Sequence, residues 1–387
     1  MYFKRKYAKL VEEKLRRYPA VGLIGPRQCG KTTLAKGLGG RYYDMEAEGG
    51  YLRLDADWAD IIHGEDLVII DEAQAKPELF SRLRGAIDEA RERKGRFLLL
   101  GSVSPVLAQK VGQSLAGRLG FVEMAPLSLV ELGEERLNAL WLYGGYPDGG
   151  IRDSAMYPEW QSDYVQALVA RDLPNWGLPA KPSQTMRLLS MLAAMHGQPF
   201  NASQLAKALG VDAKTVSAYV DFLEGAYLIR RIPAYFANLK KRLVKAPRVF
   251  LRDSGLLHSL LKVIDREHLF AQPWVGHSWE GFIIEQTLAA LALTKNNPEA
   301  FYFRTSDGYE LDLVLQWGSL RWAVEIKLTS DPSVEQIRRL EKVAAMIGAE
   351  RAVLVCRTPA SVETRSVWVI SPEEWMRRLR LENTPGF

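Results

Sequence analysis

The stretch Gly25-Pro26-Arg27-Gln28-Cys29-Gly30-Lys31-Thr32 decides the fold of the first third of this 387-residue sequence. It fits the pattern G-x-x-x-x-G-K-[S/T] of a phosphate-binding loop. The apolar run Ala20 to Ile24 precedes it and predicts a buried strand, and Thr33 to Ala35 continue as the start of a helix. A strand, a glycine-containing loop and a helix in this order indicate a nucleotide-binding unit.

Each residue type in this loop has a chemical role. Gly30 lets backbone amides approach phosphates, Lys31 places a point charge near the terminal phosphates, and Thr32 offers a hydroxyl to Mg²⁺. We therefore predict ATP and Mg²⁺ as cofactors, with Thr32 as a metal ligand. The predicted nucleotide-binding residues are Gly25, Pro26, Arg27, Gln28, Cys29, Gly30, Lys31, Thr32 and Thr33.

Two further apolar strands are predicted to end at the same site. The run Asp66 to Asp71 is followed directly by Glu72. Asp71 is expected to hold Mg²⁺ through water, and Glu72 is expected to polarise the attacking water. The run Arg96 to Ser102 places Ser102 where it could sense the terminal phosphate or orient the water. The alternative for Ser102 is a simple turn at the end of a strand.

Strands that alternate with helices predict a parallel sheet covered by helices on both faces. An amphipathic helix with Leu79, Leu83 and Ile87 fits this pattern. Further on, Arg118 in Ser114-Leu115-Ala116-Gly117-Arg118 could complete the site of a neighbouring subunit as an arginine finger, which predicts a homo-oligomer. The alternative for Arg118 is an ion pair on the surface.

This region resembles the ATPases of the AAA superfamily. More narrowly, the whole chain resembles a widespread prokaryotic family that joins such an ATPase to a C-terminal domain of unknown function, DUF4143. The stretches that carry the resemblance span almost the entire chain and are GPRQCGKTTL, LVIIDEAQ, LLLGSVSP, SLAGRL, PLSLVEL, GGYP, RDL, KRLVKAPRVFLRDSGL and the region around Glu325.

The middle of the chain is predicted to be helical. Helices expected over 137–143 and 160–173 could form a lid, in which Arg171 either pairs with Asp172 or reaches a phosphate. Helices expected over 186–195, 202–209 and 213–223, followed by a strand from Tyr227, have the order of a winged helix-turn-helix.

DNA is the partner that this middle region predicts. Lys214, Thr215 and Ser217 lie early in the expected recognition helix, although many winged helices contact only proteins. From Gly225 to Arg252 the chain has no acidic residue, and this basic stretch is either a phosphate-contacting surface or a solvated hairpin. Its eight cations are Arg230, Arg231, Lys240, Lys241, Arg242, Lys245, Arg248 and Arg252.

The last third contains a Glu-x-Lys triplet in a strand context. In the run Trp322 to Leu328, the apolar side chains alternate with Glu325 and Lys327. A preceding strand over 311–315 carries Asp312, and turns at Asp307-Gly308 and Gly318 would bring the strands side by side. Asp312, Glu325 and Lys327 are therefore expected to lie together.

A helix over 278–291, three strands, a second helix and a strand over 352–356 resemble the core of restriction-endonuclease-like nucleases. The resemblance implies that Asp312, Glu325 and Glu280 hold Mg²⁺ and that Lys327 stabilises the developing charge or helps to deprotonate water. The alternatives are a surface pair for Asp312 and Glu325, an ordinary helix carboxylate for Glu280, and a nuclease fold that binds without cleaving.

Composition limits the remaining classes of protein. Hydrophobic residues make up 47% and charged residues 25%, as in globular proteins, and the net charge is +5. No apolar run could span a bilayer, no signal peptide is recognised, and two distant cysteines, Cys29 and Cys356, fit a reducing cytoplasm. We expect an α/β protein with an ATPase domain (1–135), a helical lid or linker (136–182), a winged helix (183–250) and a nuclease-like domain (251–387).

Two functions follow from these expectations. The first is an ATPase coupled to a DNA-binding, metal-dependent nuclease-like domain. The second is a non-cleaving, ATP-driven switch that binds nucleic acid or protein.

Overall fold

The structure is a computed structural model that describes residues 3–102, 115–236, 245–294 and 298–381. Its contacts divide the chain into two compact units. The N-terminal unit contains Met1–Leu127, Arg171–Pro179 and Gly225–Tyr227, and the C-terminal unit contains Ser128–Ala170, Ala180–Glu224 and Leu228–Phe387. None of the described helices has the length and apolar character needed to cross a membrane.

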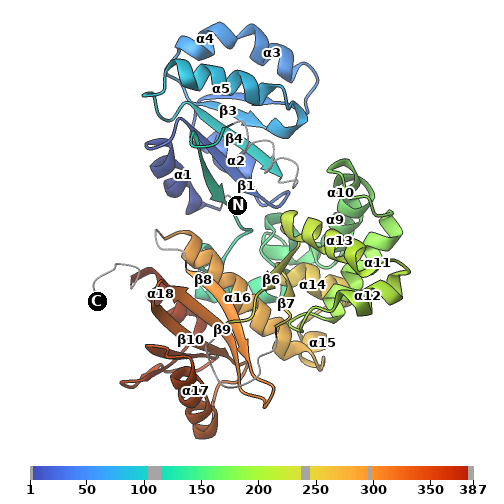
Figure 1. Cartoon of the computed structure of the whole chain (residues 1–387), viewed down its shortest axis with the longest axis vertical. Coiled ribbons are helices and arrows are strands. Elements are labelled where there is room, and N and C mark those ends of the chain that lie inside the picture. Colours follow the sequence, from blue (N-terminus) through green and yellow to red (C-terminus); the bar gives the residue numbers. More distant parts are fainter. Residues whose placement is uncertain (1–2, 103–114, 237–244, 295–297, 382–387) are drawn as a thin grey trace. The chain divides into compact units, whose positions relative to one another are not determined.

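The N-terminal unit is built on a five-stranded, fully parallel sheet with the order β2-β3-β4-β1-β5 (Figure 1). Its strands are β1 (Ala20–Gly25), β2 (Arg41–Asp44), β3 (Val68–Asp71), β4 (Phe97–Ser102) and β5 (Leu119–Glu123). The sequence-predicted strands that end at Ile24, Asp71 and Ser102 are confirmed. Since the strands are parallel, the segments that follow β1, β3 and β4 meet at one edge of the sheet.

Helices cover the sheet because each buries one apolar stripe. The helical segments of the N-terminal unit are α1 (Tyr7–Leu15), α2 (Lys31–Gly37), α3 (Gly50–Ala56), α4 (Trp58–His63), η1 (Ala73–Ala75), α5 (Leu79–Glu89) and α10 (Leu173–Asn175). Leu79, Leu83 and Ile87 of α5 are buried in one core with Leu54 of α3 and Ile61 of α4, as the spacing in α5 predicted.

The middle of the chain is helical, as predicted. Its elements are α7 (Leu129–Leu132), η2 (Glu134–Arg136), α8 (Leu137–Tyr143), η3 (Pro147–Ile151), η4 (Ser154–Met156), α9 (Glu159–Ala167), η5 (Leu168–Asp172), α11 (Pro182–Ala194), α12 (Ala202–Leu209) and α13 (Ala213–Gly225). Asn201 caps α12 by accepting a hydrogen bond from the amide of Gln204 at 3.2 Å. The antiparallel pair β6 (Ile229–Ile232) and β7 (Arg248–Leu251) follows α13.

A six-stranded mixed sheet, with the order β12-β13-β11-β10-β9-β8, forms the C-terminal part. Its strands are β8 (Glu299–Arg304), β9 (Glu310–Trp317), β10 (Leu320–Ile326), β11 (Arg351–Val355), β12 (Val362–Glu363) and β13 (Val367–Ile370). The turns at Gly308 and Gly318, both with positive φ, join β8, β9 and β10 into an antiparallel meander, as predicted.

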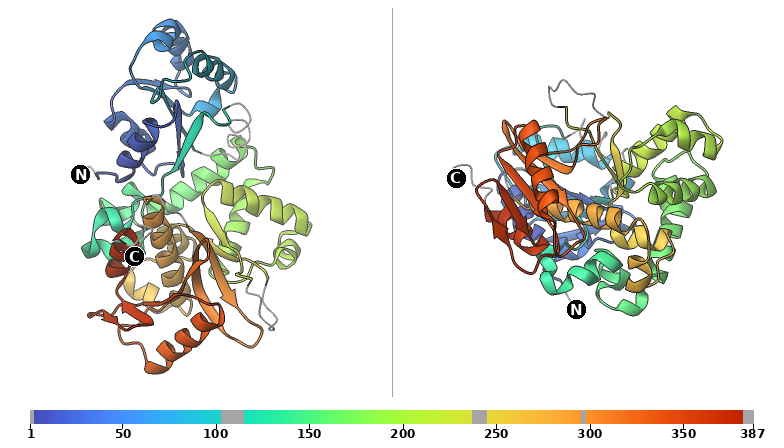
Figure 2. Two further views of the ribbon diagram at one scale, coloured as in Figure 1. Left: turned by 60° about the vertical axis from the view of Figure 1, so that its left-hand side comes forward. Right: turned by 90° about the horizontal axis from the view of Figure 1, so that it is seen from below.

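Helices lie on both faces of this sheet (Figure 2). Leu340 and Val343 of α17 (Val334–Met346) pack on one face in a shared core. On the other face, Trp375 of α18 (Pro372–Leu381) donates from Nε1 to Thr287 of α16 (Val275–Ala292), and its ring lies 5.9 Å from that of Trp322 in β10. The remaining helices are α14 (Ser254–Leu260) and α15 (Arg266–Phe270). The expected helix, three strands, helix and strand are therefore present in this order.

Candidate functional site

The loop between β1 and α2 has the backbone that a phosphate-binding loop requires. Gly30 has φ of +99° and Gln28 has φ of +61°, so successive amides turn toward the inside of the loop. A Cβ atom on Gly25 would lie 2.2 Å from the carbonyl oxygen of Met124, so only glycine fits where β1 ends. The buried Arg5 donates to the carbonyl oxygens of Cys29 and Ala125, which ties the loop to the chain after β5.

Lys31 bridges this loop with its ammonium group. Its buried Nζ donates to the carbonyl oxygens of Gly25 at 2.9 Å and Pro26 at 2.8 Å. These two oxygens satisfy the ammonium group, which is buried and needs acceptors. Negatively charged phosphate oxygens in the loop could replace them as stronger acceptors.

Thr32 and Asp71 meet at the carboxyl edge of the sheet. The Thr32 hydroxyl donates to Asp71 Oδ2 at 2.7 Å, and the Tyr42 hydroxyl donates to the same oxygen at 2.8 Å. Burial and the bond to Asp71 raise the pKa of Tyr42. Hydroxyl and carboxylate oxygens are the hard ligands that Mg²⁺ prefers, so this pair fits the predicted metal. Sequence reasoning missed Tyr42, because its strand β2 has no recognisable motif.

Glu72 is held in an uncommon backbone conformation beside this pair. Its φ of +47° lies in the left-handed region, which is rare for a residue other than glycine and concentrates at functional sites. Gln74 donates to Oε2 of Glu72, and Ser102 donates to Oε1 at 3.4 Å. Burial raises the pKa of Glu72. The predicted residues Glu72 and Ser102 are therefore brought together, whereas Gln74 was missed by sequence reasoning.

Arg27 extends from the loop into a group of carboxylates. Its guanidinium lies 2.8 Å from Asp172 and 3.4 Å from Glu46. Burial opposes the charge of Arg27, but the negative charges of Asp172, Glu72 and Glu46 outweigh it and raise the pKa. Of the other predicted loop residues, Cys29 is buried and Thr33 is exposed on the first turn of α2.

Arg118 lies away from the phosphate-binding loop of its own unit. It directly precedes β5, whose Leu119 lies beside Ala20 at the edge where the strands begin. Arg118 pairs with Asp88 of α5 through two hydrogen bonds of 2.7 and 2.8 Å. The loop is at the opposite edge. The pair with Asp88 is the alternative that was considered for Arg118, and a role in a neighbouring subunit stays a prediction. The preceding Ser114 is outside the described residues.

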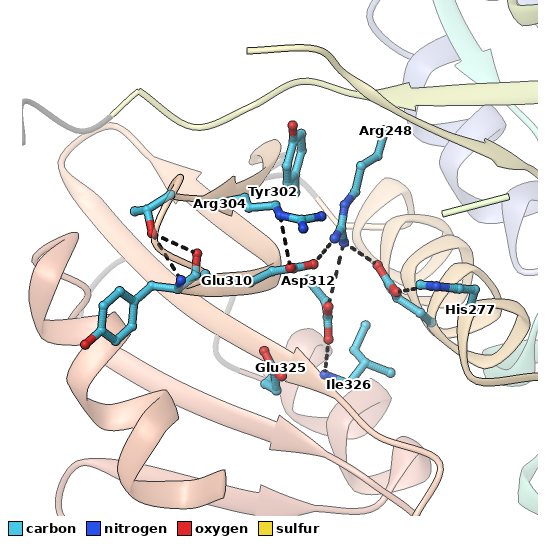
Figure 3. A network of polar contacts seen from close by, with 12 residues as sticks. Arg248, His277, Tyr302, Arg304, Glu310, Asp312, Glu325 and Ile326 are labelled. Atoms are coloured by element: carbon cyan, nitrogen blue, oxygen red, sulfur yellow. Dashed lines mark hydrogen bonds and ion pairs between the residues drawn. The ribbon is translucent and has the colours of Figure 1, made fainter. Parts of the chain in front are cut away.

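Two of the residues predicted for the nuclease-like site, Asp312 and Glu325, lie close together (Figure 3). Lys327 Nζ lies 2.6 Å from Glu325 Oε1 and 3.8 Å from Asp312 Oδ2. Asp312 also accepts a 2.8 Å hydrogen bond from the amide of Ile326, which joins β9 to β10. Strand alternation alone was sufficient to predict this grouping.

Arg248 of β7 occupies the middle of this group and was not predicted there. Its buried guanidinium lies 2.8 Å from Glu280 Oε1 and 3.8 Å from Asp312 Oδ1, and it also pairs with Glu310 (Figure 3). The Arg248 guanidinium stacks over the Tyr302 ring at 4.9 Å.

These ion pairs engage the three carboxylates that were expected to hold a metal, Asp312, Glu325 and Glu280, so this metal site stays a prediction. Arg248 pairs with Glu280 and Asp312, and Lys327 pairs with Glu325 and Asp312. Burial and the charge of Asp312 raise the pKa of both Glu280 and Glu325, which disfavours their charged forms. Within the described residues, no group of three or more His, Cys, Asp or Glu side chains could hold a metal ion.

Four arginines of the basic stretch pair inside the C-terminal unit, whereas contact of the stretch with phosphates stays a prediction. Arg230 and Arg252 bind Glu285, Arg231 binds Asp221 and Glu224, and Arg248 binds the group described above. Lys245 is exposed, and Lys240, Lys241 and Arg242 lie outside the described residues.

The start of α13 is partly used for capping. The amide and hydroxyl of Thr215 both donate to Asp212, and Ser217 donates to the carbonyl oxygen of Ala213. Lys214 is exposed. Contact of this helix with DNA stays a prediction.

The strand order and the loop site define the class of the N-terminal unit as a phosphate-loop nucleotide-binding domain. Residues 17–133 match the family described as "AAA domain". Residues 134–267 and 275–375 match two families described as "Domain of unknown function", DUF8612 and DUF4143. The expected AAA domain and the DUF4143 domain are thereby confirmed.

Two mycobacterial proteins are similar over most of the chain. "Uncharacterized protein Rv2008c" of Mycobacterium tuberculosis and "Uncharacterized protein Mb2031c" of Mycobacterium bovis are each 38% identical over 341 residues, which cover 87% of this chain and 76% of the relative. The chain belongs to the family of these proteins, and in this chain the AAA domain precedes the DUF4143 domain.

Similarity to solved structures is weaker. A signal transduction ATPase with a tetratricopeptide repeat sensor from Pyrococcus horikoshii has 13% identity and a TM-score of 0.23, with 76% of this chain and 48% of that chain covered. AMPPCP-bound DnaA from Aquifex aeolicus has 15% identity and a TM-score of 0.27, with 58% and 89% covered. Both TM-scores are below the level at which two folds are considered alike.

Proposed function

We propose that this protein hydrolyses ATP with Mg²⁺ at the carboxyl edge of the parallel sheet. The observation that carries the proposal is the meeting of Lys31, Thr32, Asp71 and Glu72 at that edge. The family match to an AAA domain supports the same activity.

Each side chain has a role that its contacts support. Lys31 would exchange the carbonyl oxygens of Gly25 and Pro26 for phosphate oxygens, and Thr32 and Asp71 would hold the metal. Mg²⁺, when bound, supplies positive charge that neutralises the phosphate oxygens. Glu72 would accept a proton from the attacking water, and Ser102 and Gln74 orient its carboxylate.

Replacing Lys31 with alanine tests the nucleotide site. A hydrogen bond to a charged group contributes about 1.5–3 kcal/mol, so we expect ATP affinity to fall about 10- to 100-fold. Titration with a fluorescent ATP analogue measures this affinity, and release of phosphate with and without Mg²⁺ measures turnover. A matched Lys9→Ala variant removes an exposed lysine of the same unit and should bind ATP normally. Equal affinity in Lys31→Ala and wild type would show that the nucleotide lies elsewhere.

For the C-terminal unit we infer the non-cleaving alternative, in which it binds nucleic acid or protein. Asp312, Glu325 and Lys327 have the grouping of a nuclease site, which supports cleavage. Arg248, however, takes the carboxylates that a metal ion would need, and this favours binding without cleavage. ATP binding would then act as the switch.

A cleavage assay separates these two functions. We expect the wild-type protein to leave supercoiled, linear and single-stranded DNA intact in Mg²⁺ or Mn²⁺, with and without ATP. The Lys327→Ala variant is assayed beside the wild type, because it removes a cation that lies 2.6 Å from Glu325. Metal-dependent cleavage by the wild type that disappears in Lys327→Ala would restore the nuclease function.

A further inference from the structure

An ion pair links the phosphate-binding loop to a segment far along the chain. Asp172, which is 3% exposed, lies at the end of η5 and belongs to the N-terminal unit together with residues up to Pro179. Its Oδ1 is 2.8 Å from Arg27 Nη1 and 2.9 Å from Arg171 Nε. One buried carboxylate is therefore shared by two guanidinium groups, and the sequence had suggested only the second pair.

The other contact of Arg27 shows where its side chain points. Arg27 follows β1, whereas Glu46, 3.4 Å from Arg27 Nη2, follows β2. Since β4 and β3 lie between β1 and β2, the Arg27 side chain extends along the carboxyl edge, where β4 ends at Ser102 and β3 is followed by Glu72. The nearby carboxylates include Glu72, whose charge favours the protonated guanidinium. The Arg27 guanidinium thus lies on the side of the loop that faces Glu72, the residue proposed to accept the water proton.

We propose that Arg27 is a catalytic arginine acting within its own chain, and that Asp172 is the positioning residue that aims it at the terminal phosphate. This rests on the proposed ATP hydrolysis. In that reaction the water oxygen bonds to the terminal phosphorus, the bond from phosphorus to the bridging oxygen breaks, and its electron pair leaves with ADP. Glu72 takes the water proton. Arg27 donates to the oxygens on which charge develops.

The structure gives this role to Arg27 rather than to Arg118. Arg118 lies at the opposite edge of the sheet, where Nε and Nη2 donate to Asp88 and Nη1 donates to the carbonyl oxygen of Ala116. The Arg27 side chain is 26% exposed, so it remains accessible to a phosphate, while the buried Asp172 fixes Nη1 at 2.8 Å and Glu46 lies 3.4 Å from Nη2. A guanidinium held in advance has less conformational entropy to lose when the charge develops.

The first test compares Arg27→Ala with Arg82→Ala, which removes an arginine of similar exposure paired with Asp55 in the same unit. Arginine fingers contribute about 10³-fold or more to turnover. We expect Arg27→Ala to reduce turnover on the order of 10³-fold, with ATP affinity changed by less than about threefold, and Arg82→Ala to behave like wild type. ADP with aluminium fluoride mimics the transferring phosphoryl group, so its affinity should fall in Arg27→Ala while the affinity for ADP alone is retained.

The second test separates positioning from folding. Asp172→Asn should lower turnover and the affinity for ADP with aluminium fluoride while leaving the affinity for ADP alone close to wild type, which shows that the folded site persists. Asp172→Glu, which restores the charge, should recover part of both losses. Wild-type turnover together with unchanged aluminium fluoride affinity in Arg27→Ala would overturn the inference. A wild-type protein that releases no phosphate from ATP would instead overturn the proposed function.

Discussion

Replacing Glu72 with glutamine is expected to lower the rate of ATP hydrolysis by about 10²- to 10⁴-fold, the usual contribution of a general base. Glutamine has nearly the same shape but accepts no proton from water. Gln74 can still donate to the one remaining side-chain oxygen, and the Ser102 hydroxyl can accept from the new amide NH2 group, so the local structure should persist. ATP binding should be retained, because Lys31, Thr32 and Asp71 are unchanged.

Single-turnover hydrolysis measures the rate of the chemical step, and equilibrium titration measures the affinity for ATP. Glu48→Gln is the control, since Glu48 is an exposed carboxylate of the same unit. A Glu72→Gln protein that hydrolyses ATP at the wild-type rate would mean that another group takes the proton. Loss of both binding and hydrolysis would assign Glu72 to nucleotide binding, because a base acts only on the chemical step.

The core of the nucleotide site could be predicted because its motif residues follow apolar strands. Each of Lys31, Asp71 and Ser102 lies at or just after the end of a parallel strand, and parallel strands bring such ends together. Tyr42 and Asp172 could not be predicted in the same way. Strand β2 is short and has no motif, and the place of Asp172 beside Arg27 depends on how a distant helical segment folds back.

In the C-terminal group of Asp312, Glu325 and Lys327, the place of Arg248 was not predicted, for a different reason. Period-two alternation placed Glu325 and Lys327 on one face of a strand, and the contacts between them confirm it. The run of cations that contains Arg248 suggested a surface, because charged residues are rarely buried. In the structure, carboxylates from α16 and β9 surround Arg248, and these partners lie far away in the sequence. Local charge patterns cannot reveal such partners.

Removing Glu285 is expected to destabilise the C-terminal unit by about 3–5 kcal/mol, the usual cost of breaking a buried ion pair. Glu285 of α16 is 9% exposed and accepts hydrogen bonds from Arg230 at 3.1 Å and from Arg252 at 3.3 Å. Glu285→Ala leaves these two guanidinium groups close together without an anion. The urea midpoint of the unit, followed by tryptophan fluorescence, should fall accordingly.

Asp148→Ala provides the control, because Asp148 forms an exposed pair with Arg152 and should change stability by less than about 1 kcal/mol.

The pH dependence of stability distinguishes the effect of the Glu285 charge from the effect of its packing. Burial opposes the charge of Glu285, but Arg230 and Arg252 outweigh it, so the pKa of Glu285 is lowered on folding. Because the pKa is lower in the folded state, the charged carboxylate stabilises that state fully at pH values above the pKa of the unfolded chain. This stabilisation is lost as the pH falls through the lower pKa of the folded state. The difference in stability between wild type and Glu285→Gln should therefore be constant near neutral pH and narrow only in acid. A difference that is the same at every pH would mean that Glu285 acts through packing alone.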